Sequence, residues 1–363
     1  MKIAVNLLNY FSAPMGGDES FVKNLIKGFN IYKPEDMQFV YLISKPAFPK
    51  FKKLLKKEKV KVFNTGHDRI RLRLIWQNIK LKKIIPNQVD ILFTPQFKLP
   101  RKINNTKTVS VFHDCQYKDL PDNFTFLERR YFDYINYITI KNSDFIVSIS
   151  EFTKEKINQY YNLDIPLQVI HNPIKIKKNI SKKTEKEILK KYNLKKEEYY
   201  YTLSANYKHK NLITLVKLFS NKIDDKLIIT GPLRDRSSLL KIKNDKNIKL
   251  TGYISEIDKN VLLKNCKLFL FPSVYEGFGM PIIEALLHGK KVITTRKASI
   301  PEVSLNKAQY VNDPYNLNEW YNKILETEKN GLKISPKTQK LFSKKYSIKT
   351  ISNRYLNLFK NIE

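Results

Sequence analysis

The sequence predicts an α/β protein of two domains, each built on a doubly wound parallel β-sheet. Three observations support this prediction: a length of 363 residues, short runs of almost continuous apolar residues, and helical patterns between these runs. The length is enough for two domains of ordinary size. Apolar runs without polar alternation are typical of strands buried on both faces of a parallel sheet, and their alternation with helices indicates repeated β-α-β units.

Seven apolar runs lie in the first half of the chain and six in the second. In chain order they read KIAVNLL, QFVYLIS, VKVFN, VDILFTP, TVSVFHD, DFIVSIS and LQVIHNP, followed by YYYTLSA, DKLIITG, NIKLTGY, CKLFLFPS, KKVITT and AQYVND. The first run is expected to be a buried strand and no signal peptide, because Asn6 interrupts it and no small-residue cleavage site precedes Gly16. The main helical patterns cover residues 21–29, 126–140, 152–161 and 211–219.

A polar, lysine-rich stretch over residues 174–198 separates the two sets of runs. It contains one helical segment, SKKTEKEILKKYNL, with Ser181 as its expected cap, and no run that could form the core of a sheet. We therefore expect a first domain over residues 1–172 and a second over residues 173–345.

The charge balance is strongly basic, with 67 Lys and Arg against 34 Asp and Glu and a net charge of +33. A surplus of this size favours an anionic partner, which could be a phospholipid surface, a polyphosphate ligand or a nucleic acid; the remaining alternative is a compositional bias that serves no such partner. No apolar stretch approaches the roughly 18–20 residues that span a bilayer. We expect a cytoplasmic protein, peripheral at the inner face of the membrane, with Cys115 and Cys266 as core residues in a reducing compartment.

Two basic segments have amphipathic helical patterns. KFKKLLKKEKVK, residues 50–61, places Phe51, Leu54 and Leu55 on one helical face among lysines. Such a helix could anchor the protein at a membrane interface or pack its apolar stripe on the sheet, and we favour the second interpretation. RIRLRLIWQNIKLKKII, residues 69–85, is expected to be an amphipathic helix of the first domain.

The segment FPSVYEGFGMPIIEALLHG, residues 271–289, predicts an anion-binding turn between a strand and a helix. Pro281 suits the first turn of a helix because it has no N–H to leave unpaired, and Gly289 is the usual left-handed terminator. The turn at residues 277–279 then presents backbone N–H groups and the positive end of the helix dipole at the carboxyl edge of a parallel sheet.

Two glutamates flank this turn. Glu284 lies one turn into the helix and could accept hydrogen bonds from the vicinal hydroxyls of a ribose. Glu276 precedes the turn and would face the group on the other side of a diphosphate. Two isolated glutamates would indicate only a solvated loop residue and an acid favoured by the helix dipole, but this whole context suits a nucleotide sugar.

The segment FPSVYEGFGMPIIEALLHGKKVITTRKASIPEV resembles the signature of glycosyltransferase family 4, a retaining group with the GT-B fold whose hallmark is two glutamates separated by seven residues. The resemblance extends over most of the chain. It includes MGGDESFVKNLIKGF as the glycine loop and first helix, VSVFHD, FIVSISEFTKEKI, YKHKNLITLVKLF, LTGYIS as the loop that meets the base, and SKKYSIKTISNRYLNLF as the closing helix.

This resemblance implies two Rossmann-like domains that face each other across a cleft. The second domain would bind the nucleotide sugar, and the first would lie on the acceptor side. A closing helix within residues 346–363 would cross back to the first domain.

The resemblance also assigns roles to individual residues. Lys210 would lie on the diphosphate, where an ammonium stabilises the leaving group as negative charge accumulates. His113 would bond the donor sugar, with Asp114 as a candidate to orient its ring, and Glu276 would position the sugar and stabilise oxocarbenium-like charge. The residues expected at the donor diphosphate and sugar are Gly16, Gly17, Gly277, Phe278, Gly279 and Met280. Those expected at the ribose and base are Glu284, Tyr253 and Ile254.

The sequence departs from the family pattern at Ser204, where many members have an arginine six residues before the lysine. Lys208 and His209 are the candidates to supply the second positive charge. The sequence contains no Asp-x-Asp motif, so we expect no metal and no cofactor beyond the nucleotide-sugar co-substrate.

Together these features predict a retaining glycosyltransferase that moves a hexose from a nucleotide-diphosphate sugar to a hydroxyl of a glycan or lipid-linked acceptor. Surface polysaccharide biosynthesis, of the lipopolysaccharide or capsule type, is the expected pathway, and GDP-mannose and UDP-sugars both remain open as donors. One alternative is a glycosyltransferase acting on a tRNA or DNA base, which the charge of +33 would suit. A second is a non-catalytic sugar-nucleotide-binding partner subunit, and a weaker third is a GT-B sugar-nucleotide epimerase, whose motif the context of Glu276 does not resemble.

Overall fold

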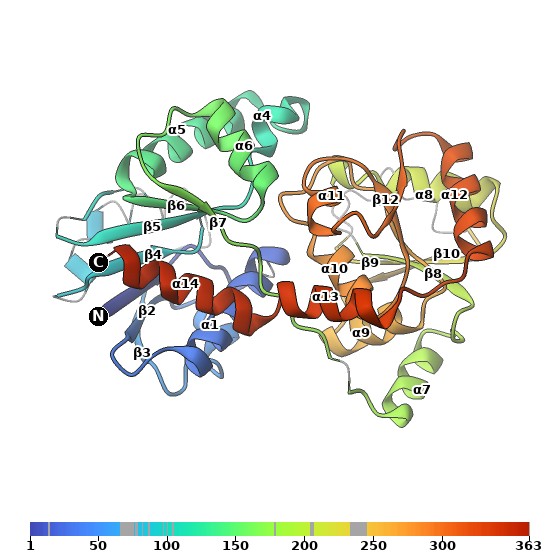
Figure 1. Cartoon of the computed structure of the whole chain (residues 1–363), viewed down its shortest axis with the longest axis horizontal. Coiled ribbons are helices and arrows are strands. Elements are labelled where there is room, and N and C mark those ends of the chain that lie inside the picture. The colour runs from blue at the N-terminus through green and yellow to red at the C-terminus, as the bar shows by residue number, and fades with distance from the viewer. Residues whose placement is uncertain are drawn as a thin grey trace. The chain divides into compact units, whose positions relative to one another are not determined.

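The computed structural model describes the whole chain apart from residues 14, 66–75, 77–78, 82, 86–87, 97, 100, 104, 178, 204–206, 233–244 and 363. The chain divides into two compact units (Figure 1). Unit 1 comprises Met1–Ile174 and Tyr346–Glu363, and unit 2 comprises Lys175–Lys345.

Unit 1 is built on a parallel sheet of seven strands in the order β3-β2-β1-β4-β5-β6-β7. The chain steps from β1 toward one edge and then from β4 toward the other, which is the doubly wound arrangement that the sequence predicted. All seven apolar runs of the first half form these strands. Their bounds are β1 (Lys2–Leu7), β2 (Gln38–Ser44), β3 (Lys59–Phe63), β4 (Ile91–Thr94), β5 (Lys107–Phe112), β6 (Phe145–Ser148) and β7 (Leu167–Val169).

Helices cover both sides of this sheet, with α5 and α6 on one side and α1 and α14 on the other (Figure 1). Their starting points follow from local capping. Thr125 and Glu128 form a reciprocal capping box at the start of α5, and the Ser150 hydroxyl accepts from the Thr153 N–H at the start of α6. The bounds are α1 (Gly17–Tyr32), α2 (Phe48–Phe51), α4 (Gln116–Asp119), η1 (Pro121–Asn123), α5 (Phe126–Asn142), α6 (Glu151–Tyr160) and α14 (Ile348–Ile362).

The C-terminal helix α14 packs against α1 within unit 1. Gly28 of α1 allows the two helices to approach closely, because a Cβ atom at this position would lie 1.7 Å from the Oγ of Ser352. Farther along, the Phe93 ring meets the rings of Tyr355 and Phe359 edge to face, with 5.3 Å between the centroids of Phe93 and Phe359. The closing helix predicted from the sequence is therefore part of the first unit's core.

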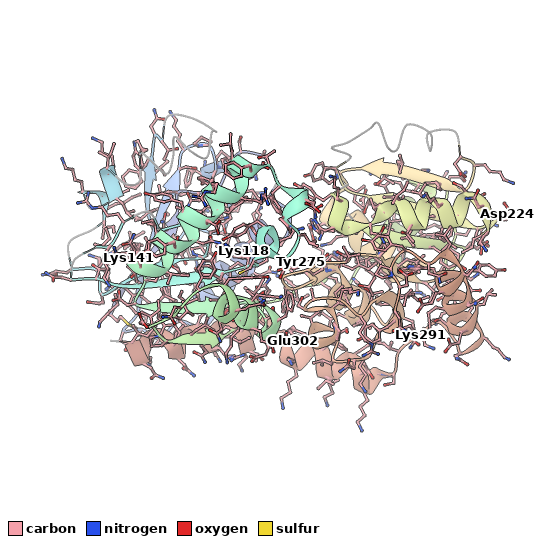
Figure 2. The ribbon with its side chains drawn as sticks, turned by 90° about the horizontal axis from the view of Figure 1, so that it is seen from above. Lys118, Lys141, Asp224, Tyr275, Lys291 and Glu302 are labelled. Atoms are coloured by element: carbon pink, nitrogen blue, oxygen red, sulfur yellow. The ribbon has the colours of Figure 1, made fainter. Side chains whose placement is uncertain are left out.

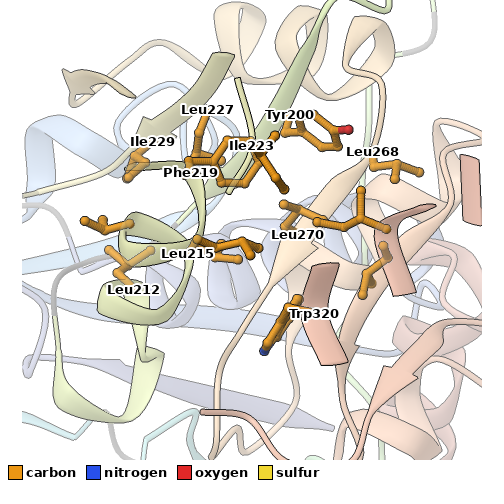
Figure 3. Close-up of a cluster of buried hydrophobic side chains, with 14 of the residues drawn as sticks. Tyr200, Leu212, Leu215, Phe219, Ile223, Leu227, Ile229, Leu268, Leu270 and Trp320 are labelled. Carbon is orange, nitrogen blue, oxygen red and sulfur yellow. The ribbon is translucent and has the colours of Figure 1, made fainter. Parts of the chain in front are cut away.

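Unit 2 contains a parallel sheet of six strands in the order β10-β9-β8-β11-β12-β13, formed by all six apolar runs of the second half. A buried cluster that includes Phe219, Leu270 and Trp320 packs on this sheet (Figure 3). The indole N–H of Trp320 donates to the Pro314 carbonyl at 3.0 Å, so its polar atom is satisfied. The strands are β8 (Tyr199–Leu203), β9 (Lys226–Thr230), β10 (Ile248–Gly252), β11 (Phe269–Phe271), β12 (Val292–Thr295) and β13 (Gln309–Val311).

The helices of unit 2 alternate with these strands. Ser181 caps the first of them, as predicted, by accepting from the Thr184 N–H. The bounds are α7 (Lys182–Lys191), η2 (Lys208–Lys210), α8 (Leu212–Asn221), α9 (Glu256–Asn265), α10 (Met280–Leu287), α11 (Ile300–Val303), α12 (Leu317–Lys329) and α13 (Pro336–Lys345).

The lysine-rich segment 50–61 is not a single amphipathic helix, so this prediction was wrong. Helix α2 ends at Phe51, turns follow, and the edge strand β3 begins at Lys59. Phe51 and Leu55 are buried in unit 1, while the lysines at positions 52, 53, 56 and 57 are exposed. The apolar side chains thus serve the packing of the domain. Much of the helix predicted over residues 69–85 lies outside the described residues.

Both cysteines are free and buried, as predicted, and burial raises the pKa of Cys266 to about 12. Among the described residues, no helix has the length and apolar character needed to cross a bilayer.

Candidate functional site

The predicted turn between a strand and a helix is present at the carboxyl end of β11. Gly279 takes a left-handed conformation, with φ 81°, and α10 begins at the next residue. Pro281 lies in the first turn of this helix, and Gly289, with φ 81°, follows its last turn. Both residues therefore act as their sequence context predicted, because proline needs no N–H acceptor at a helix start and glycine tolerates a positive φ.

Lys210 and Glu276 form an ion pair at this edge of the sheet. The Lys210 Nζ lies 2.6 Å from the Glu276 Oε1, and both side chains are largely buried. The two residues come from different segments, one from η2 after β8 and the other from the loop after β11. The structure thus joins two residues that the resemblance placed on the diphosphate and the sugar, and it gives each charge a partner in poorly solvated surroundings.

Backbone contacts hold the two segments together. The Val274 N–H and the Ser273 hydroxyl both donate to the His209 carbonyl, at 2.8 and 3.2 Å. On the other side, the Ser299 hydroxyl donates to the Glu276 carbonyl at 2.9 Å. Hydrogen bonds to main-chain carbonyls therefore fix the backbone of the two segments that carry the ion pair, which limits the movement of the Glu276 carboxylate.

Asn211 shapes the step from η2 into α8. It is a non-glycine residue with a positive φ of 48°, a conformation that asparagine adopts more readily than most residues. Its amide donates to the Pro314 carbonyl at 3.0 Å, and its Oδ1 accepts from the Thr214 hydroxyl at 2.8 Å. These bonds explain why the Lys210–Asn211 pair occurs at this place, because the asparagine secures the turn that carries the lysine.

The candidates for a second cation differ in charge. Burial, and next the charge of Lys210, lower the pKa of His209 to about 3, so its imidazole is neutral near pH 7. His209 can therefore offer a hydrogen bond but no positive charge. Lys208 is exposed, and Ser204 lies outside the described residues.

Glu284 is buried in α10 and pairs with Lys259 of α9, whose Nζ lies 2.9 Å from its Oε1. Lys259 also contacts Glu256, at 3.0 Å. Burial raises the pKa of Glu284, and the charge of Lys259 opposes this rise while Glu256 adds to it. Burial alone would lower the pKa of Lys259, but the two carboxylates outweigh it and leave this pKa above its usual value.

Lys259 was missed in the sequence because it lies 25 positions before Glu284 and nothing between them indicates that α9 and α10 meet. Tyr253 and Ile254, predicted at the base, lie just before α9. The Tyr253 side chain is 60% exposed, Ile254 is half-buried, and Gly252 ahead of them has φ 68°.

Unit 1 carries the other predicted residues at the carboxyl ends of β1 and β5. Gly16, with φ 61° and ψ −127°, adopts a conformation essentially restricted to glycine, and α1 begins at Gly17. His113 follows β5 and is buried. Its Nε2 lies 2.8 Å from the Pro95 carbonyl oxygen, and its Nδ1 lies 3.4 Å from the Asp18 Oδ1.

Asp18 was not singled out from the sequence, although it stands two residues after Gly16 in the same motif. Asp114, proposed to orient the His113 ring, accepts from the Gln116 N–H at 3.0 Å. Burial lowers the pKa of Lys98, and the charges of Asp18 and Asp114 oppose this shift. Lys98 after β4 therefore lies within electrostatic range of Asp18 in the first turn of α1 and of Asp114 after β5.

Two family models match the chain. The one described as Glycosyltransferase Family 4 matches residues 16–178, and the one described as Glycosyl transferases group 1 matches residues 184–346. The O-antigen chain mannosyltransferase RfbU of Salmonella typhimurium is 27% identical over 246 residues, which cover 66% of this chain and 65% of that protein. The O-antigen chain mannosyltransferase B of Escherichia coli is 24% identical over 233 residues, which cover 61% of this chain and 60% of that protein. The matched stretch therefore spans less than two-thirds of either relative.

Among solved structures, HepE of Anabaena in complex with UDP and glucose matches with a TM-score of 0.75 at 17% identity, over 99% of this chain and 100% of that one. The two parallel-sheet units and this likeness define a protein of the GT-B fold. The two family matches, which together extend over nearly the whole chain, identify its family. The chain belongs to glycosyltransferase family 4.

Proposed function

We propose that the protein transfers a hexose, with retention, from a nucleotide-diphosphate sugar to a hydroxyl of a glycan or lipid-linked acceptor during surface polysaccharide assembly. The observation that carries this proposal is the Lys210–Glu276 ion pair at the carboxyl end of β11, beside the turn that opens α10. The names of the two O-antigen mannosyltransferases support the pathway, and the UDP and glucose of the HepE structure support the donor class.

The chemistry follows from charge. As the glycosidic bond to the diphosphate breaks, negative charge grows on the leaving phosphate, and Lys210 with the α10 amides would stabilise it without a metal. Positive charge grows on the sugar ring, and the Glu276 carboxylate would stabilise it. The acceptor hydroxyl would attack from the face that the phosphate leaves, and the phosphate would take its proton.

The Glu284 carboxylate would hold the ribose, and Lys259 would position it. Because Lys259 pairs with one carboxylate oxygen, the other could accept from a ribose hydroxyl. Replacing Lys259 removes the charge that opposes the raised pKa of Glu284, so this carboxyl would bind protons up to a higher pH. A protonated Glu284 carboxyl accepts a hydrogen bond from a ribose hydroxyl more weakly than the carboxylate does. As the pH falls, the variant would therefore lose donor binding at a higher pH than the wild type does.

We therefore expect Lys259→Met to raise the donor KM about tenfold at pH 7, as loss of a charge-assisted hydrogen bond does, with a small change in kcat. As the pH is lowered in a series of steady-state assays, the donor KM of this variant should begin to rise at a higher pH than the donor KM of the wild type does. The matched control is Lys264→Met on the same helix, whose lysine pairs with Glu185. Equal KM–pH profiles for the two variants would show that Lys259 only supports the fold.

The donor itself can be found by thermal unfolding with GDP-mannose, UDP-glucose and UDP-N-acetylglucosamine. A donor at one hundred times its dissociation constant should add about 2.7 kcal/mol to the free energy of unfolding. Transfer to a lipid-linked acceptor is then followed by mass spectrometry with the stabilising donor. Stabilisation by tRNA or duplex DNA in a salt-dependent manner, with no response to any donor, would contradict the proposal and favour a nucleic-acid substrate.

A further inference from the structure

Helix α5 exposes several large apolar side chains on the surface of unit 1. Phe126, Leu127, Tyr134 and Tyr137 are 65%, 67%, 64% and 58% exposed. Scattered exposed apolar residues are ordinary, but several on one helix of a folded domain indicate a contact surface.

These four residues lie on one face of the helix together with two basic residues. At about 100° per residue, Arg130 and Lys141 fall among them, within an arc of about 100°. The residues buried in unit 1, among them Ile135 and Thr139, lie on the opposite face. We call the exposed face the α5 stripe, which consists of Phe126, Leu127, Arg130, Tyr134, Tyr137 and Lys141.

Negative charge is kept away from the stripe. Glu128 lies on the far side of the helix, where its carboxylate bonds to Thr125 in the capping box. Asp133 lies near the border of the stripe, and Lys118 of α4 neutralises it at 2.5 Å. Figure 2 labels Lys118 and Lys141, the latter at the C-terminal end of α5. Among the described residues, neither Arg130 nor Lys141 forms an ion pair, so the face combines apolar side chains with positive charge.

The helix holds this face rigidly. The capping box fixes the first turn, which carries Phe126 and Leu127. Toward the other end, the Thr139 hydroxyl accepts from the Leu99 N–H at 3.1 Å, and the Ser143 hydroxyl donates to Ser110 at 2.7 Å. The backbone that carries the stripe is therefore ordered before any partner binds, which lowers the entropic cost of docking.

We propose that the α5 stripe docks unit 1 onto an anionic phospholipid surface. Phenylalanine and leucine insert at the boundary between headgroups and acyl chains, tyrosine has an apolar body and a polar tip suited to this boundary, and lysine and arginine attract anionic headgroups. A net charge of +33 favours such a surface and opposes pairing with a second copy of the chain. Docking rests on the proposed function in one respect, because it would bring the enzyme to a lipid-linked acceptor.

Vesicle sedimentation tests the proposal directly, with phosphatidylcholine vesicles that contain or lack phosphatidylglycerol. The wild type should bind the anionic vesicles, and a variant with serine at Phe126, Leu127, Tyr134 and Tyr137 should bind at least tenfold more weakly. The matched control carries serine at four exposed apolar residues outside the stripe, Ile31, Tyr315, Leu325 and Leu341, and should bind as the wild type does within about twofold. Arg130→Gln and Lys141→Gln should each weaken binding about fivefold, and only to the anionic vesicles.

Several outcomes would overturn docking. Docking is contradicted if the stripe variant and the control variant bind anionic vesicles equally well, or if the wild type does not bind them. It is also contradicted if the wild type and the control form a dimer or a complex with tRNA and the stripe variant does not. The last outcome would make the stripe a contact with a second copy or with nucleic acid. Donor-induced thermal stabilisation and transfer to a short water-soluble acceptor should persist in the stripe variant within about twofold. If the wild type shows neither donor-induced stabilisation nor sugar transfer, but its binding to vesicles still depends on the stripe, the proposed function is wrong and the docking proposal is supported.

Discussion

Lys210→Ala is expected to reduce kcat about 10²–10³-fold, the loss typical of removing one preorganised group that stabilises developing charge. The substitution removes the positive charge 2.6 Å from Glu276 and leaves this carboxylate largely buried without the cation. In the proposed mechanism both changes would act on the same step, because the leaving diphosphate would lose its ammonium and Glu276 would lose the partner that positions it. Single-turnover kinetics with the donor identified by thermal unfolding measure the effect on the chemical step.

The control for this prediction is Lys217→Ala, which removes an equal charge from an exposed position on α8, the next helix. It should change kcat by no more than about twofold. Glu276→Gln should also lower kcat strongly, and in combination with Lys210→Ala the losses should not add, because the two side chains act as a pair. A Lys210→Ala enzyme within threefold of the wild type would contradict the catalytic role of this lysine.

Gly28→Val is expected to destabilise unit 1 by about 3 kcal/mol, at the upper end of what overpacking costs. A Cβ at Gly28 would lie 1.7 Å from the Ser352 Oγ, 2.7 Å from the Ser352 Cβ and 2.9 Å from the Ile348 Cγ2. A rotation of the serine side chain relieves only the first of these contacts, so α14 must move away from α1. Replacing a mid-helix glycine would by itself favour the helix slightly, so a net loss reports the packing. Thermal unfolding should show a midpoint lower by roughly 6–12 °C.

A compensating substitution separates this clash from other effects. Gly28→Ala should destabilise less than Gly28→Val, and the double variant Gly28→Ala with Ser352→Gly should recover much of the loss, because it removes the side chain that the new Cβ meets. Unchanged stability of Gly28→Val would show that α14 does not need this close contact with α1.

Local features of the site and fold could be predicted because each depends on neighbours in the chain. The thirteen strands of the described residues lie where apolar runs occur, because a strand that is buried on both faces consists almost entirely of apolar residues. The cap at Ser181, the proline in the first turn of α10 and the glycine after its end follow from backbone groups within one turn. The prediction of a helix over the lysine-rich segment 50–61 was wrong. The spacing of its apolar residues suits a helix, but in the packed domain this segment forms a short helix, turns and an edge strand.

The sequence by itself determined which residues form the strands and where several of the helices begin and end, because these depend on short-range sterics and hydrogen bonding. Only the tertiary structure decided that Lys259 pairs with Glu284 and that Asp18 reaches His113, since both contacts join elements whose distance no local pattern encodes. It also decided that the aromatic side chains of the α5 stripe face outward. Periodicity separates one face of a helix from another, but only the packed domain shows which face remains uncovered.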